Sequence, residues 1–208
     1  MRLEGRKISF RYNRGPWVLR EVSIAVRAGE IVGLAGPSGC GKTTLGRILS
    51  GYLAPLAGEV TLDGQPLPRS GRHPVQLIHQ HPERAVNPRW RMRQTLEEGG
   101  MPEEALLESL GVEEGWLDRW PNELSGGELQ RICIARALGS GARFVIADEM
   151  TAMLDAVSQA QVWHAVLSKA RRENVALLAI SHDLNLLEKI CDRILRWEEL
   201  KSANPGSD

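Results

Sequence analysis

The chain has little cysteine, no excess of charge of either sign and no long apolar run. Its three cysteines among 208 residues are odd in number and far apart, so their spacing suits neither a disulfide framework nor a metal site. Lysine plus arginine and aspartate plus glutamate both number 26, which gives no reason to expect nucleic acid or an anionic membrane as a partner. These absences indicate a protein of a reducing compartment that does not bind nucleic acid.

No apolar segment reaches the roughly 20 residues that span a bilayer, and the first residues lack the pattern of a signal peptide. Internal repeats and low-complexity tracts are absent as well. The length is sufficient for one large domain with a substantial core.

The most informative segment runs from Gly36 to Thr44 and fits the pattern G-x-x-x-x-G-K-[ST]. Glycines let the backbone wrap around an anion, so that successive N–H groups can point at phosphate oxygens. Lys42 supplies a positive charge for the terminal phosphates, and the Thr43 hydroxyl suits Mg²⁺. The residues expected to bind a nucleotide here are Gly36, Pro37, Ser38, Gly39, Cys40, Gly41, Lys42, Thr43 and Thr44.

The flanking residues supply the context that this pattern requires. Residues 30–35 are apolar enough for a buried strand, and Leu45, Ile48, Leu49 and Tyr52 follow at helical spacing. A glycine-rich structural turn is the alternative, but strand, loop and helix in this order favour nucleotide binding.

Residues 3–28 are predicted to form antiparallel strands joined by a turn at 13–16. Tyr12 lies at the edge of that turn, where its ring could stack on an adenine base or serve as an ordinary strand aromatic. Residues 58–64 predict a strand that enters an Asp-Gly hairpin turn.

Polar residues follow three further predicted strands. The strand at 75–80 ends in His79 and Gln80, the strand at 144–147 precedes Asp148 and Glu149, and the strand at 174–180 precedes His182. Ligands of open α/β sheets bind at the carboxyl ends of the strands. Asp148 suits Mg²⁺, and Glu149 is placed to orient or deprotonate a water at the terminal phosphate.

Residues 82–121 carry little strand signal and predict a mostly helical insert, with one helix at 103–110. Ser125 and Glu128 then form a capping box at the start of a helix. With Gly126 and Gly127 this helix end is either a second anion site or a simple cap. Asp155 is expected to cap a helix that runs to about residue 172.

The remaining chain predicts a helix at 184–190 and a last strand at 193–197, with a frayed tail after Leu200.

These motifs, in this order, make the sequence resemble the ATP-binding subunits of ABC transporters over nearly the whole chain. Tyr12 matches the adenine-stacking aromatic of that family, and Gln80 matches the glutamine of its Q-loop. The other matches are Walker A (36–44), the LSGGQ-type signature (124–131), Walker B with its catalytic glutamate (144–149), the end of the D-loop (154–155) and the switch histidine (His182).

Within the family the sequence is most similar to the dipeptide, oligopeptide and nickel importer ATPases. Asn87-Pro88, residues 128–131 and residues 147–149 all have the character of that group. Met150 replaces the usual proline after the glutamate and His81 stands where aspartate is common, but neither departure removes a catalytic group.

The resemblance implies an α/β fold: a P-loop NTPase core with a mainly parallel sheet, an N-terminal antiparallel β subdomain and an inserted helical subdomain. It implies one domain over 1–208, with its core at about 1–81 and 132–208 and the helical subdomain at about 82–131. It implies hydrolysis of ATP with Mg²⁺, with Glu149, His182 and Lys42 as catalytic residues. The implied metal-site residues are Thr43, Gln80 and Asp148.

The resemblance also implies a homodimer or heterodimer with a second ABC ATPase subunit. Each ATP would be bound in trans by a set from the other subunit: Ser125, Gly126, Gly127, Glu128 and Asp155. Integral membrane permease subunits are the implied further partners, which would place the chain in the cytoplasm, peripheral on the inner face of the cell membrane. The segment 83–95, with four arginines and Trp90, is the expected docking surface.

Three functions remain open from the sequence. The chain is a transport motor on a permease, a soluble ABC-type ATPase of another complex such as a phosphonate-breakdown assembly, or a nucleotide-gated assembly module with little turnover. The presence of Glu149 and His182 argues against the third.

Overall fold

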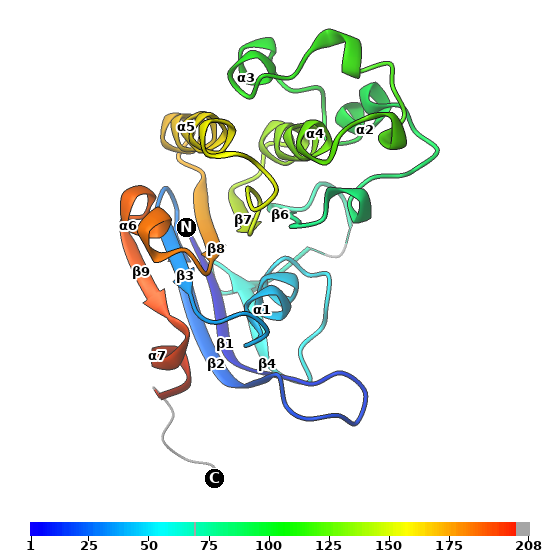
Figure 1. Ribbon diagram of the computed structural model, residues 1–208. Helices are drawn as coiled ribbons and strands as arrows, with labels where there is room; N and C mark the ends of the chain where they lie inside the picture. Colours follow the sequence, from blue (N-terminus) through cyan, green and yellow to red (C-terminus); the bar gives the residue numbers. More distant parts are fainter. Residues whose placement is uncertain (69, 203–208) are drawn as a thin grey trace.

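The computed structural model describes residues 1–68 and 70–202, and Figure 1 traces their arrangement in two sheets and a helical layer. An antiparallel sheet has the order β2-β1-β4-β5 and a parallel sheet the order β6-β7-β8-β3-β9. The strands are β1 (Arg2–Phe10), β2 (Leu19–Arg27), β3 (Ile31–Ala35), β4 (Ala57–Leu62), β5 (Gln65–Pro66), β6 (Val75–Ile78), β7 (Phe144–Asp148), β8 (Ala176–Ser181) and β9 (Arg193–Arg196).

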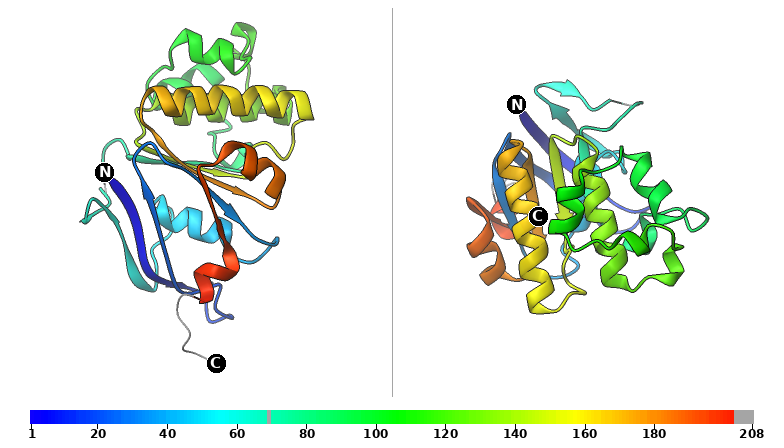
Figure 2. Two further views of the ribbon diagram at one scale, coloured as in Figure 1. Left: turned by 90° about the vertical axis from the view of Figure 1, so that its left-hand side faces the viewer. Right: turned by 90° about the horizontal axis from the view of Figure 1, so that it is seen from above.

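The helices separate into groups around the parallel sheet. They are α1 (Lys42–Leu49), α2 (Met92–Glu98), α3 (Glu104–Ser109), α4 (Gly126–Gly139), α5 (Ala156–Arg172), α6 (Leu184–Ile190) and α7 (Trp197–Ser202), with short 3-10 turns at Pro82–Arg84, Glu114–Trp116 and Pro121–Glu123. Helices α2 to α5 lie on one side of the parallel sheet, and α1 and the antiparallel sheet lie on the other (Figure 2). The predicted α/β fold is confirmed. None of the described helices is long and apolar enough to cross a membrane.

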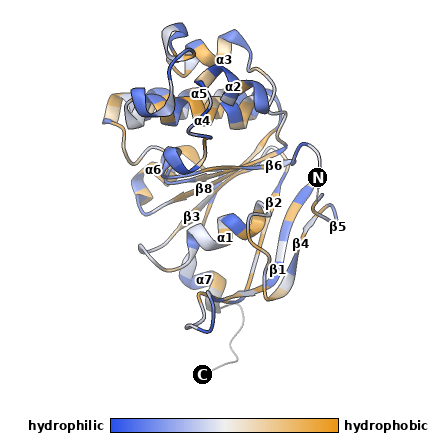
Figure 3. Ribbon diagram, turned by 90° about the vertical axis from the view of Figure 1, so that its right-hand side faces the viewer, coloured by the Kyte–Doolittle hydropathy of each residue, from blue (hydrophilic) through white to orange (hydrophobic). Residues whose placement is uncertain are grey.

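The three central strands of the parallel sheet, β3, β7 and β8, are buried at every position, because nearly all of their residues are apolar. In β7, Phe144 and Ile146 pack with α1 and the antiparallel sheet, whereas Val145 and Ala147 pack with the helices on the other side. This alternation follows from the two-residue period of a strand. Figure 3 shows the resulting hydrophobic strands beneath helices of mixed hydropathy. The two cores hold the sheet, and therefore its carboxyl edge, in a fixed geometry.

The two predicted hairpin turns are present. Gly15 N–H donates to the Tyr12 carbonyl at 3.0 Å in the turn between β1 and β2. Asp63 and Gly64 both have positive φ, 52° and 76°, between β4 and β5. Positive φ at both central residues is the requirement of the tight hairpin turn that Asp-Gly favours.

Residues 82–131 contain α2, α3 and the three 3-10 turns, and α4 begins among them and continues to Gly139. The predicted boundary between residues 131 and 132 thus falls inside α4. This helix contacts both α2 and β6, so it joins the helical layer to the sheet.

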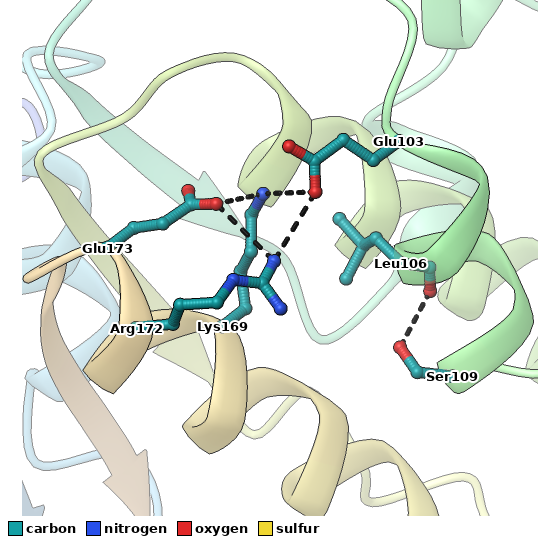
Figure 4. Close-up of polar contacts among 6 residues, drawn as sticks. All are labelled: Glu103, Leu106, Ser109, Lys169, Arg172 and Glu173. Carbon is teal, nitrogen blue, oxygen red and sulfur yellow. Dashed lines mark hydrogen bonds and ion pairs between the residues drawn. The ribbon is translucent and has the colours of Figure 1, made fainter.

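Ion pairs connect the start of α3 to the carboxyl-terminal part of α5 (Figure 4). Glu103, the N-cap residue of α3, lies 3.5 Å from Lys169 Nζ and 3.3 Å from the Arg172 guanidinium. Lys169 is only 5% exposed and also pairs with Glu173 at 2.5 Å. A buried ammonium needs such partners, because losing them would leave an uncompensated charge.

Two sequence predictions about element ends were wrong. Tyr52 does not continue α1 and is 61% exposed, because the helix ends at Leu49 with Ser50 as its C-cap, and Gly51 adopts φ 78°. Gly51 N–H bonds to the Ile48 carbonyl and Tyr52 N–H to the Arg47 carbonyl, which is a Schellman ending. Trp197 does not end the last strand but begins α7, which continues the chain to Ser202. The frayed tail was predicted to begin after Leu200, but residues 201 and 202 belong to α7; the rest of it, from residue 203 on, lies outside the described residues.

Candidate functional site

The carboxyl edge of the parallel sheet gathers the residues that the sequence singled out. All five strands run in the same direction, so the segments that follow β3, β6, β7 and β8 meet at one edge. These segments contain the loop 36–41, Gln80, Glu149 and His182, and Asp148 is the last residue of β7 itself. Residues up to 146 positions apart in sequence thereby share one site.

The loop 36–41 joins β3 to α1 and has the shape of an anion cradle. Gly39 and Gly41 have φ of 77° and 116°, a conformation in which L side chains are strained. A Cβ added at Gly39 would meet no other atom within 4 Å, so its backbone faces open space. Gly41 is the N-cap of α1 and provides no side-chain cap, which leaves the first N–H groups of the helix available to an anion.

Lys42 is held by this loop. Its Nζ donates to the carbonyl oxygens of Gly36 at 2.7 Å and Pro37 at 2.8 Å, and the residue is only 5% exposed. The ammonium is therefore fixed at the inner wall of the cradle by the loop itself. A fixed positive charge beside open N–H groups is the chemistry that binds polyphosphate.

Thr43 and Asp148 meet at the base of the site. The Thr43 Oγ1 donates to Asp148 Oδ1 at 3.1 Å, and Asp148 is 3% exposed. Burial raises the pKa of Asp148, and the hydrogen bond from Thr43 partly opposes that rise. A hydroxyl and a carboxylate at this distance are oxygen donors of the type that Mg²⁺ prefers. No cluster of three or more His, Cys, Asp or Glu side chains that could hold a metal occurs in the described part of the chain.

Glu149 is held between two polar side chains at the mouth of the site. Its Oε2 accepts from Gln80 Nε2 at 3.1 Å, and its Oε1 lies 3.1 Å from His182 Nδ1. The Glu149 side chain is 16% exposed and that of His182 is 60% exposed. The Glu149 backbone has φ 47°, and its N–H donates to the Ile180 carbonyl at 3.0 Å. A non-glycine residue with positive φ next to a phosphate cradle is typical of a functional position.

Tyr12 lies beside α1. Its hydroxyl is 3.3 Å from Thr44 Oγ1, its ring packs edge-on against Phe10, and the residue is 45% exposed. The exposed ring next to the phosphate loop agrees with a stacking surface for a base.

Residues 125–128, the second predicted anion site, form the N-terminal cap of α4. They lie apart from the first predicted site, the loop 36–44. The Ser125 Oγ accepts from Glu128 N–H at 3.3 Å, and Glu128 Oε2 accepts from Ser125 N–H at 2.6 Å. Asp155 caps α5 and, with residues 125–128, lines an open hollow of about 710 Å³. No residue of the loop 36–44 lines this hollow. Within one chain, the two parts of the predicted nucleotide site therefore do not meet.

The sequence was compared with known protein families. Residues 19–152, more than half of the chain, match the family described as ABC transporter. The chain belongs to the ABC transporter family.

Curated ABC relatives cover most of the sequence. The nickel import ATP-binding protein NikE of Escherichia coli is 36% identical over 197 residues, which are 86% of this chain and 74% of NikE. NikE of Rhodospirillum rubrum is 36% identical over 203 residues, 88% of this chain and 73% of the relative. These comparisons confirm the predicted resemblance and make the chain an ABC-type ATPase.

Solved ABC structures share the fold. The dimeric structure of MJ0796, described as a bacterial ABC transporter cassette, superposes with a TM-score of 0.81 at 24% identity and covers 93% of each chain. At that identity the similarity supports the fold alone.

One contact of this ABC site was not predicted from the sequence. Trp197 of α7 packs directly against the phosphate loop, at Gly36 and Gly41. The available signal was positional: the last strand runs parallel to β3, and a large aromatic residue follows it immediately. The sequence prediction assigned Trp197 to the last strand, so its contact with the loop was not predicted.

Proposed function

We propose that the chain is the ATP-hydrolysing subunit of an ABC importer for nickel, peptides or a similar small solute. The observation that carries the proposal is the convergence of Lys42, the Thr43–Asp148 pair and the Gln80–Glu149–His182 cluster at one sheet edge. The 36% identity to nickel import ATPases supports the importer class. The soluble phosphonate-breakdown alternative has no such support among the relatives reported above.

In the proposed reaction, Glu149 orients a water and accepts its proton as the water oxygen attacks the γ-phosphorus. The bond from phosphorus to the bridging oxygen breaks, and ADP and phosphate leave. Gln80 and His182 hold the two carboxylate oxygens of Glu149, which restricts the carboxylate to one orientation. General-base catalysis depends on such positioning.

The loop 36–41 and Lys42 stabilise the negative charge on the phosphates. Their donors are already arranged, so little reorganisation is needed when charge moves in the transition state. Thr43, Asp148 and Gln80 would hold Mg²⁺, which when bound neutralises charge on the β- and γ-phosphate oxygens. Tyr12 would stack on the adenine.

The proposed active form is a head-to-tail dimer. Ser125, Gly126, Gly127, Glu128 and Asp155 line a hollow away from the loop 36–44 of their own chain. A second ABC subunit, identical or not, would bring its own hollow against that loop and complete each site in trans.

Complementation tests the trans arrangement in a protein shown to homodimerise with MgATP. Chains with Ser125→Arg and chains with Lys42→Ala should each be inactive alone. An equal mixture should recover up to about a quarter of the wild-type rate, because half of the dimers then contain one intact composite site.

The control for this mixture is a chain with both changes, which should rescue neither single variant. ATP hydrolysis by the mixtures is measured as phosphate release. No recovery at any mixing ratio would contradict the trans arrangement.

The proposed permease surface lies between the core and the helical layer. A groove of about 450 Å³ is lined there by Tyr52, Arg72 and Arg136, among others. The segment 83–95 follows Gln80 directly, but two of its arginines make contacts within the chain. Arg91 lies over the Trp120 ring and donates to the Asp118 carbonyl, and Arg93 pairs with Glu114 at 2.7 Å. Arg84 and Arg89 are exposed and are better placed to meet a partner.

We expect the double change Arg89→Ala and Trp90→Ala to abolish co-purification with cell membranes and stimulation by the permease. Basal phosphate release by the isolated subunit should stay near the wild-type value, because neither side chain lies at the sheet edge that holds the nucleotide. Interface energy concentrates in arginine and tryptophan, so two changes suffice.

Arg143→Ala is the matched control, an exposed arginine at the amino end of β7. It should leave membrane association unchanged. Persistent association of the double variant would place the docking surface elsewhere. If the wild-type chain does not co-purify with membranes, a non-transport complex is favoured. That result would also contradict the proposed position on the inner face of the membrane.

The proposed division into a core (about 1–81 and 132–208) and a helical subdomain (about 82–131) fits this scheme. Gln80 lies where the two parts join and contacts Glu149. The Nε2 of Gln130 on α4 donates to the His79 carbonyl at 3.2 Å, which links α4 to the same segment. Movement at the site can therefore reach the permease surface through few bonds.

A further inference from the structure

The register of the parallel sheet places Trp197 next to the start of the phosphate loop. In the pairing of β3 with β9, Leu34 lies opposite Leu195 and Ala35 opposite Arg196. The residue after each strand is Gly36 on one side and Trp197 on the other. Trp197, at the junction of β9 and α7 (Figure 1), therefore lies beside Gly36, although the two residues are 161 positions apart in the sequence.

The contacts extend along the loop. A Cβ on Gly36 would lie 2.7 Å from the Trp197 Cβ, and a Cβ on Gly41 would lie 3.1 Å from its Cζ2. The same Cβ on Gly41 would also lie 3.1 Å from Val18. The first and last glycines of the motif therefore both lie against the Trp197 side chain, and Gly41 also lies against Val18.

Trp197 is 2% exposed, and its Nε1 finds no hydrogen-bond partner in the described part of the chain. A buried N–H without a partner is rare and costs free energy. A leucine or phenylalanine would avoid that cost if filling the core were the whole role. The presence of the larger indole points to the additional reach that its six-membered ring provides toward Gly41.

We propose that Trp197 is a positioning residue for nucleotide binding, which holds the backbone of the loop 36–41 in its phosphate-binding shape. The inference rests on the proposed function of this site. Glycine-rich backbone has the most conformational freedom to lose, so an unsupported loop would become ordered only when the phosphates bind. A rigid support removes that cost from the binding step, as preorganisation does in general.

The test compares Trp197→Leu with Phe144→Leu. Phe144 is a buried aromatic residue of the same core cluster, but it stands at the amino end of β7, away from the site. Both variants are assayed at a temperature at which circular dichroism finds them folded. We expect Trp197→Leu to raise the KM for MgATP about tenfold with kcat within about twofold of wild type.

Phe144→Leu should leave KM unchanged even where it lowers the melting temperature. A partly unfolded population reduces the amount of active enzyme, and so the apparent kcat, without altering the KM of the folded molecules. The split between KM and kcat therefore separates support of the loop from a general role in the core. The dissociation constant of a fluorescent ATP analogue provides a second measurement that does not depend on turnover.

If Trp197→Leu does not fold, Trp197→Phe takes its place. Phenylalanine keeps the contact of the ring with Gly36 but loses the reach to Gly41, so we expect KM to rise by about threefold. An unchanged KM in a folded Trp197 variant, with normal MgATP binding by wild type, overturns the role of Trp197 alone. Failure of the wild-type chain to bind MgATP overturns the proposed function and the inference with it.

Discussion

Replacement of Glu149 by glutamine is expected to slow ATP hydrolysis at least about a hundredfold while MgATP binding is retained. Glutamine has nearly the same shape but accepts no proton from water. The Gln80 and His182 side chains, each 3.1 Å from a carboxylate oxygen, would still hold the group in place. The loss is therefore chemical rather than structural.

The measurements are phosphate release, the dissociation constant for MgATP, and the oligomeric state with MgATP present. The variant should accumulate as a dimer, because its nucleotide is not consumed. Glu59→Gln provides the control, since it makes the same chemical change on an exposed residue of β4. Fast hydrolysis by Glu149→Gln would show that another group acts as the base.

Replacement of Lys42 by alanine is expected to lower ATP affinity or turnover by at least about a hundredfold. Two losses combine in this variant. The charge that faces the phosphates disappears, and so do the two hydrogen bonds that hold the Gly36 and Pro37 carbonyls at 2.7 and 2.8 Å.

The fold should survive the Lys42 change, which is checked by circular dichroism and thermal unfolding. The control is Lys189→Ala, which removes an exposed ammonium from α6. Binding and hydrolysis at wild-type levels in Lys42→Ala would contradict the assignment of the loop 36–44 as the phosphate site.

Most of this site was predictable because its chemistry restricts the residue types. A phosphate cradle needs glycine where φ is positive, as at Gly39 and Gly41, and it needs a lysine at the first position of the helix, as at Lys42. A parallel sheet places polar residues after each strand at one edge. Asp148, Glu149 and His182 could therefore be assigned to one site from sequence order alone.

The features that the sequence did not predict depend on contacts between distant residues. Trp197 follows the short strand β9 without a capping signal, and its partners Gly36 and Gly41 lie more than 150 positions earlier. The end of α1 was extended to Tyr52 because the helical spacing continues past the point where Gly51 stops the helix. Arg91 contacts Trp120 and Arg93 pairs with Glu114, so these contacts depend on how residues 114–120 pack against the start of α2.

The proposed site is tested most directly by a crystal structure of Glu149→Gln grown with MgATP. We predict that the phosphates lie within hydrogen-bond distance of the loop 36–41 and Lys42, with Thr43 and Asp148 at the metal. We also predict a second copy, with Ser125 of the partner subunit at the γ-phosphate. Nucleotide bound away from this loop, or a bound nucleotide with Ser125 of every copy turned to solvent, would contradict the proposed site.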